Sequence, residues 1–172
     1  DREREDDGQQ GDQRRPAVVT LADDEWVASF HDDNDIVWTR RFDKNGDPVL
    51  RRPERRVNDI TTHDQGSPTV ARATNNSNVM VAYTSPPRGG QASDREVFAK
   101  IFDTRGEKVI KEEFQVNTYS KNTQSHPALA GGPDRFVAVW DSQGQDGSLS
   151  GVFGQMYTSD GQNFGNEFQV NT

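Results

Sequence analysis

The sequence contains no cysteine, which excludes disulfide bonds, thiol nucleophiles and thiolate metal sites. It has no apolar run long enough to span a membrane, and no secretory signal begins at Asp1, so we expect a soluble, mature or trimmed product. No window keeps the spacing of an amphipathic helix, so helix content should be near zero. The net charge of −8 makes nucleic acid an unlikely partner.

Repetition is the main positive signal. The hexapeptide Glu-Phe-Gln-Val-Asn-Thr occurs at residues 113–118 and again, unchanged, at residues 167–172. A more divergent third copy appears when other anchors are aligned, because Gln-x-x-Pro begins at Gln13, Gln65 and Gln124. A fixed repeat of this length is typical of stacked or radial architectures. We therefore divide the chain into a polar N-terminal arm (1–12) and three repeats (13–58, 59–117 and 118–172).

Each repeat has four short segments rich in valine and aromatic residues, bounded by Gly, Asn, Asp, Ser and Pro, which predicts β-strands. Gly46, Gly106 and Gly161 follow the third segment at one fixed offset and predict a hairpin to the fourth. Apolar inner segments and a polar fourth segment favour β-propeller blades over a β-solenoid. The predicted fold is all-β and propeller-like, with three four-stranded antiparallel blades in a partial propeller. The aromatic residues expected in its core, together with one valine, are Trp26, Phe30, Trp38, Phe42, Val81, Tyr83, Phe98, Phe102, Phe136, Trp140, Phe153 and Tyr157.

The third repeat suggests a family. Its segments read Phe-Gln-Val-Asn-Thr-Tyr-Ser (114–120), Gln-Ser-His-Pro-Ala-Leu-Ala (124–130), Phe-Val-Ala-Val-Trp (136–140) and Gly-Val-Phe-Gly-Gln (151–155). They resemble tandem propeller-like repeats of large secreted or surface proteins of bacteria and protists. The resemblance implies an extracellular or cell-surface location and a structural or adhesive role, and it brings no catalytic residues. The first repeat departs from it at Arg51–Arg56.

The loop after the second segment is the first candidate site. In the third repeat an aromatic residue precedes a run of oxygen donors, which is a possible sugar subsite. The residues of that candidate ligand site are Trp140, Asp141, Gln143 and Asp146. In the first repeat Asp32, Asp33 and Asp35 carry the donors that calcium prefers, although the spacing is not that of a known calcium loop and an ordinary Asx-rich turn is favoured. No other cofactor is expected.

Two further features are surface candidates. Arg51, Arg52, Arg55 and Arg56 form either a solvated outer edge or a docking edge for an acidic neighbour. Asn75 begins a glycosylation sequon on a turn, usable if the source secretes through a eukaryotic pathway.

Catalysis is not indicated by any motif. The three histidines occupy unrelated repeat positions, and neither a nucleophile motif nor a Gly-rich phosphate loop is present. We therefore expect a non-enzymatic extracellular structural or adhesive repeat protein, a building block of a surface or filamentous assembly. The alternative is a lectin-like, carbohydrate-binding propeller. Closed propellers use four to eight blades, so we also expect the end repeats to pack against further blades, supplied by identical chains, a partner or a longer parent protein.

Overall fold

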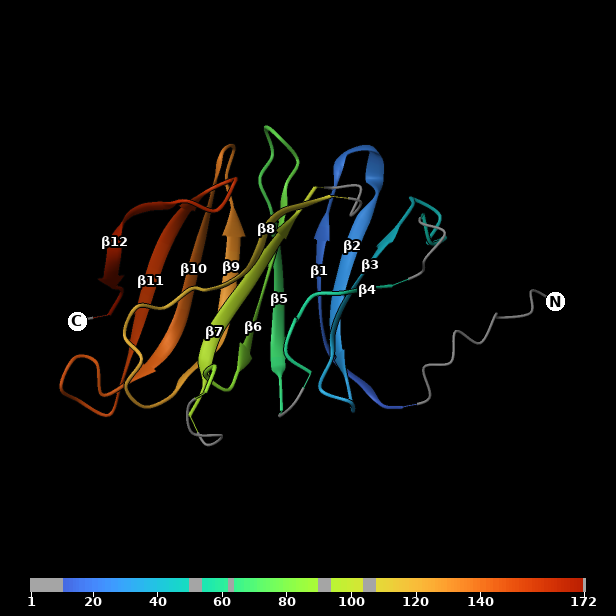
Figure 1. Cartoon of the computed structure of the whole chain (residues 1–172). Helices are drawn as coiled ribbons and strands as arrows, with labels where there is room; N and C mark the ends of the chain where they lie inside the picture. Colours follow the sequence, from blue (N-terminus) through green and yellow to red (C-terminus); the bar gives the residue numbers. More distant parts are fainter. Residues whose placement is uncertain (1–10, 50–53, 62–63, 90–93, 104–107, 172) are drawn as a thin grey trace.

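The computed structural model of the chain describes residues 11–49, 54–61, 64–89, 94–103 and 108–171, and they form three four-stranded antiparallel sheets (Figure 1). Blade 1 contains β1 (Gln13–Thr20), β2 (Trp26–Asp32), β3 (Val37–Phe42) and β4 (Arg55–Arg56). Blade 2 contains β5 (Gly66–Arg72), β6 (Val79–Ser85), β7 (Glu96–Phe102) and β8 (Val109–Gln115). Blade 3 contains β9 (Gln124–Gly131), β10 (Arg135–Gln143), β11 (Ser150–Thr158) and β12 (Asn163–Gln169). The described residues contain one helical element, the 3₁₀ turn Ala22–Asp24.

The blades lie side by side, and within each one the strands follow chain order (Figure 1). The first strands are neighbours, because β1 contacts β5 and β5 contacts β9. They therefore line the axis around which the blades are arranged. This is the predicted fold, an all-β partial propeller.

The repeated Val-Asn of the fourth segment is hydrogen-bonded to the third strand of its own blade. The asparagine side chain accepts a backbone hydrogen bond at the start of the third strand, and the preceding valine N–H donates to the carbonyl of that same residue. The asparagine bonds are Asn58 Oδ1 to Val37 N at 2.8 Å, Asn117 Oδ1 to Val97 N at 2.8 Å and Asn171 Oδ1 to Val152 N at 2.6 Å. An asparagine is needed here because a buried backbone N–H must find an acceptor where the strand ladder ends.

The repeated glutamate of the same motif joins neighbouring blades. Glu113 of β8 accepts the backbone N–H of Asp59 at 2.6 Å, and Glu167 of β12 accepts that of Thr118 at 2.7 Å. In both cases the donor directly follows the motif asparagine of the preceding blade. The hexapeptide is therefore repeated because it makes the same two connections, one within a blade and one between blades.

Two apolar clusters hold the blades together, one between blades 1 and 2 and one between blades 2 and 3. We define the back face of a blade as the face toward the preceding blade, and the front face as the face toward the next. The back faces carry aromatic residues, as in Tyr83 and Phe98 of blade 2 or Trp140 and Tyr157 of blade 3. The front face of blade 2 carries smaller and aliphatic residues instead, which are Met80, Ala82, Val97, Ala99 and Ile101. Between blades 2 and 3 the core therefore consists mainly of aromatic side chains of one back face packed on aliphatic side chains of the facing front face.

The expected core is correct for blades 2 and 3 but wrong for blade 1. All eight predicted core residues of blades 2 and 3 are at most 6% exposed. The four aromatic residues of the back face of blade 1 are only half-buried, and they are Trp26, Phe30, Trp38 and Phe42. Periodicity identified these positions as apolar, but burial requires a preceding blade, and none is present among the described residues.

Close approach of two first strands requires Gly131 at the end of β9. A Cβ atom there would lie 1.8 Å from the carbonyl oxygen of Arg72 in β5. Beside this contact a hollow of about 410 Å³ opens between the later halves of the first strands, lined by residues that include Val18, Ala71 and Leu129. No helix in the described ranges has the length and apolar character needed to cross a membrane.

Candidate functional site

A β-bulge places one polar side chain from each first strand at the start of the axial surface. The three residues are Arg15, Ser67 and His126, each the third residue of a Gln-x-x-Pro segment, with φ of 51°, 50° and 50°. Strand pairing shifts register at this point in all three blades. Non-glycine residues rarely adopt positive φ, and bulges of this kind redirect side chains. The bulge has the same backbone conformation in all three blades. It therefore turns the side chain at this position toward the axial surface in each blade, whatever the residue type.

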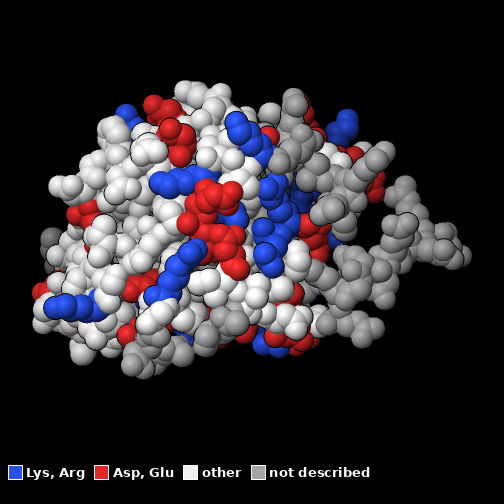
Figure 2. All heavy atoms as spheres, in the orientation of Figure 1, with Lys and Arg blue, Asp and Glu red and all other residues white. Residues whose placement is uncertain are grey.

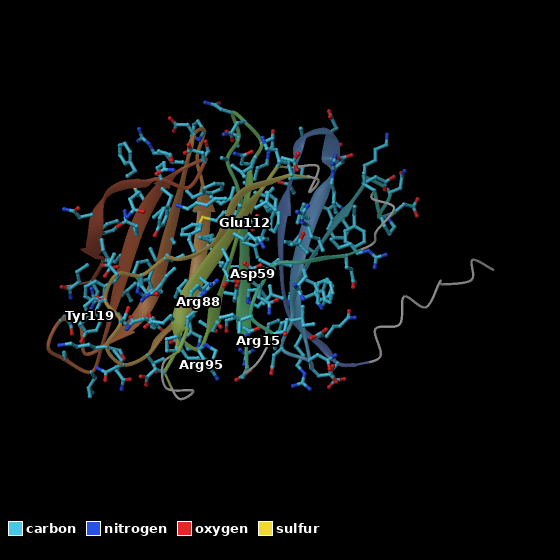
Figure 3. All side chains as sticks on the ribbon, in the orientation of Figure 1. Arg15, Asp59, Arg88, Arg95, Glu112 and Tyr119 are labelled. Atoms are coloured by element: carbon cyan, nitrogen blue, oxygen red, sulfur yellow. The ribbon has the colours of Figure 1, made fainter. Side chains whose placement is uncertain are left out.

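The second strands contribute a further residue at the same level. His31, Thr84 and Asp141 occupy this place, because they pair with residues adjoining the bulges. We call these six residues the axial mouth: Arg15, His31, Ser67, Thr84, His126 and Asp141. Figure 3 labels Arg15 and Arg95 near one end of the sheets, and Arg95 there binds Asp64, with Nη2 and Oδ2 2.8 Å apart.

Several mouth residues take part in hydrogen bonds, and one of these bonds joins two blades. Arg15 Nη1 donates to Ser67 Oγ at 3.0 Å, which joins blade 1 to blade 2. Thr84 Oγ1 donates to the carbonyl of Gly66 at 3.0 Å. His126 Nδ1 lies 2.9 Å from Asp141 Oδ2, and these side chains are 73% and 50% exposed. The His126–Asp141 pair is therefore oriented by its own contact and open to an incoming ligand.

His31 is the unusual member of the mouth. The residue is 8% exposed, and neither of its ring nitrogens has a hydrogen-bond partner in the part of the chain that the structure describes. Burial lowers the pKa of His31, and the positive charge of Arg15 lowers it further. A buried polar group without a partner is uncommon in proteins and often marks a functional position.

The mouth residues differ from blade to blade although the positions repeat. The bulge carries arginine, serine and histidine, and the second-strand position carries histidine, threonine and aspartate. The motif asparagine and valine, by contrast, are the same in all three blades. The positions therefore share a backbone conformation but not a side-chain chemistry.

The sequence-derived ligand residues do not converge on one another. Trp140 is 1% exposed and packs in the cluster between blades 2 and 3, so its ring face is not open to a sugar. Asp141 belongs to the axial mouth. Gln143 is exposed, and Asp146 is occupied in the loop, where it accepts the N–H of Ser148 at 2.9 Å. Sequence alignment put Trp140 beside the polar loop but could not show that its side chain points to the opposite face from Asp141.

The acidic residues of the first repeat have separate surroundings. Asp32 accepts backbone N–H groups from Asn34 and Ile36, and its second oxygen accepts the Trp38 indole N–H at 2.9 Å. Asp33 is exposed, and burial raises the pKa of Asp35. The described ranges contain no group of three or more His, Asp or Glu residues placed to hold a metal ion. Calcium binding stays a prediction.

The other surface candidates are the outer-edge arginines of the first repeat and Asn75. Arg51 and Arg52 lie outside the described residues; Arg55 packs over the Phe102 ring at 4.7 Å, and Arg56 is exposed. Asn75 is exposed in the turn between β5 and β6. Figure 2 shows basic and acidic side chains gathered near the middle of one side of the molecule, the region where Figure 3 labels Asp59 and Glu112. Lys100 Nζ lies 2.8 Å from Asp59 and 3.3 Å from Glu112. Because its charges are paired with one another, this cluster fastens the outer strands.

Comparisons with solved structures give the fold. No protein-family model and no curated protein sequence matches the chain. An N-acetylgalactosamine deacetylase from F. plautii, solved with blood group B trisaccharide, is 13% identical with a TM-score of 0.59, covering 92% of this chain and 53% of that one. An endo-arabinase from Bacteroides thetaiotaomicron has 10% identity, a TM-score of 0.55 and coverage of 94% and 64%. An alpha-L-arabinofuranosidase from Clostridium thermocellum has 11% identity, a TM-score of 0.54 and coverage of 91% and 52%.

These comparisons correct the expected function. The sequence predicted a non-catalytic structural or adhesive protein, yet the similar structures are carbohydrate-processing enzymes. The expectation relied on local motifs, and residues that different blades bring together do not form one. The chain spans about half to two thirds of the length of these proteins. Identity this low shows the fold alone, and that fold is a partial β-propeller.

Proposed function

We propose that this chain is part of an extracellular, carbohydrate-active β-propeller whose saccharide site is the axial mouth. The observation that carries the proposal is the set of polar side chains that the three bulges present at one end of the first strands, with Arg15 bonded to Ser67 and His126 paired with Asp141. The fold is consistent with it, since the similar structures act on sugars. Sugar recognition relies on hydrogen-bonding side chains, which the mouth supplies as guanidinium, hydroxyl, imidazole and carboxylate groups.

Each mouth residue has a role that depends on its surroundings. Asp141 accepts from His126 Nδ1 and so fixes the orientation of the imidazole. The remaining nitrogen, Nε2, is then free to exchange a proton with a sugar oxygen, as a general acid or base does. Arg15 and Ser67 are already bonded to each other at 3.0 Å and form a preorganised donor pair for sugar hydroxyls.

The test is a polysaccharide screen that includes xylan, arabinan and blood-group oligosaccharides. Binding is measured by calorimetry and turnover by release of reducing ends. We expect His126→Ala to lower turnover by about 10²–10⁴-fold, the usual contribution of a general acid or base. Asp141→Asn should lower it less, since it disturbs only the orientation of the ring, and Arg15→Ala should weaken binding.

Matched controls lie on the same molecule but away from the mouth. Arg56→Ala removes an exposed arginine from β4, and Asp134→Asn neutralises an exposed acid before β10. Both should behave as wild type. Binding without turnover would reject the catalytic role of His126 while supporting the saccharide site. Loss of function in the controls, or none in the mouth variants, would overturn the proposal.

A further inference from the structure

The outward faces of the two end blades are exposed and apolar. On the front face of blade 3, four large apolar residues are between 36% and 51% exposed, and they are Met156, Phe164, Phe168 and Val170. On the back face of blade 1 the four half-buried aromatic residues are joined by Val18, which is 65% exposed. Contiguous apolar surface of this kind marks an interaction site in a soluble protein.

The front face of blade 3 repeats the surface that blade 3 itself covers on blade 2. By position in the strands, Val137 and Val139 of β10 correspond to Met80 and Ala82 of β6. In β11, Gly154 and Met156 correspond to Ala99 and Ile101 of β7. Every one of these blade 2 residues is fully buried under the aromatic back face of blade 3. The β10 and β11 part of the front face of blade 3 is therefore an aliphatic surface of the type that receives an aromatic back face, with Phe164 and Phe168 beside it on β12.

The back face of blade 1 is the matching half. Phe30 and Phe42 occupy the places of Tyr83 and Phe102 in blade 2, and both of those are at most 3% exposed against blade 1. The largest difference in exposure is at Val18, which is 65% exposed, whereas its counterpart Val70 in blade 2 is 7% exposed. The aromatic rings of blade 1 are also already ordered: Trp26 and Phe42 stack with ring centroids 4.0 Å apart.

We propose that the back face of blade 1 binds the front face of blade 3 of a second copy of this chain, head to tail. Both halves of the blade-to-blade interface are present on one molecule, at opposite ends, so a second copy supplies the complement of each. Each contact joins two different surfaces, and closing the pair makes the same contact twice, related by a two-fold axis. Two copies of three blades give six, which lies within the range of closed propellers. The inference is independent of the proposed saccharide site.

Sedimentation velocity of the 172-residue chain from about 1 to 100 μM tests the association. We expect a species of twice the 19.3 kDa chain mass. Phe30→Asp on the back face and Phe168→Asp on the front face should each weaken association by about 30-fold, as expected for a charge placed in the centre of an apolar interface. Leu149→Asp is the matched control, since Leu149 is 87% exposed in the loop between β10 and β11 and belongs to neither face.

Mixing the two variants tests the head-to-tail geometry. Phe30→Asp keeps an intact front face and Phe168→Asp keeps an intact back face, so their mixture can form one intact interface. The mixture should therefore associate one-to-one more tightly than either variant does alone. A symmetric interface, in which the same face meets itself, would not be restored by mixing. If Phe30→Asp lowers the melting temperature, Val18→Asp replaces it, because that side chain is already exposed. A monomeric wild type, or folded variants that fail to combine, would overturn the proposal.

Discussion

Two phenylalanines at the same position in neighbouring blades differ in burial, and this difference predicts a large difference in stability. Phe42 ends β3 and Phe102 ends β7, each directly opposite the first residue of its second strand. Phe102 is 3% exposed between blades 1 and 2, whereas Phe42 is half-buried on the open back face of blade 1. Phe102→Ala leaves a cavity in close-packed surroundings and should cost about 3–5 kcal/mol.

Phe42→Ala removes a ring that is partly in water and leaves no enclosed cavity. The cost should then be about 1–2 kcal/mol, the value of the remaining apolar contact area. Both free energies are measured by urea denaturation at concentrations where the chain is monomeric, because association would bury Phe42. In thermal melts Phe102→Ala should lower the midpoint by roughly 6–20 °C. Equal losses for the two variants would refute the assignment of open and closed faces.

Three further predictions concern buried hydrogen-bonding and charged groups. Asn117→Ala should lower the free energy of unfolding by about 2–3 kcal/mol in urea denaturation, because it leaves the buried Val97 N–H unpaired. Asn171→Ala, at the exposed counterpart in blade 3, should lower it less. Equal losses for the two variants would contradict the role given to the motif asparagine. Burial raises the pKa of Glu96 above its ordinary value of 4.5, so its ionised form destabilises the fold as pH rises through the raised pKa. Glu96→Gln should therefore raise the melting temperature at pH 7, with the gain disappearing below about pH 4.5, and an unchanged or lower value at pH 7 would contradict this sign. Tyr157→Phe removes the hydroxyl that donates to the Val116 carbonyl at 2.7 Å and should cost about 1–2 kcal/mol; a neutral result in denaturation would show that this bond contributes little.

Local patterns were sufficient to predict the strands and their grouping into blades. Alternating valine and aromatic residues identified the second and third strands, and the Gly at a fixed offset identified the β11–β12 hairpin at Gly161, because both depend on neighbours in the chain. In blade 1 the turn at Gly46 leads instead to the isolated bridge between Phe42 and Pro48, and Gly106 lies outside the described residues. The motif asparagine was visible as a repeat, but its bond to the start of the third strand was not. That bond joins residues about twenty positions apart, and only the fold brings them together.

The axial mouth could not be predicted for a related reason. Gln-x-x-Pro was recognised as a strand start, yet its third residue looked arbitrary because Arg15, Ser67 and His126 have nothing in common chemically. The signal was the position itself, a positive-φ bulge that recurs in each first strand. His126 and Asp141 meet only because the register of β9 and β10 shifts at the bulge, where Ser125, the neighbour of His126, pairs with Asp141.

Mapping of a bound saccharide by ¹⁵N NMR tests the central claim most directly. The oligosaccharide selected by the screen is titrated into the labelled chain, and amide shifts are followed by residue. The account predicts that the shifts concentrate at Arg15, Ser67, His126 and Asp141, with little change at Leu149 or on the outer strands. Shifts centred on the outer strands or on the outward faces of the end blades, or no saccharide binding at all, would contradict it.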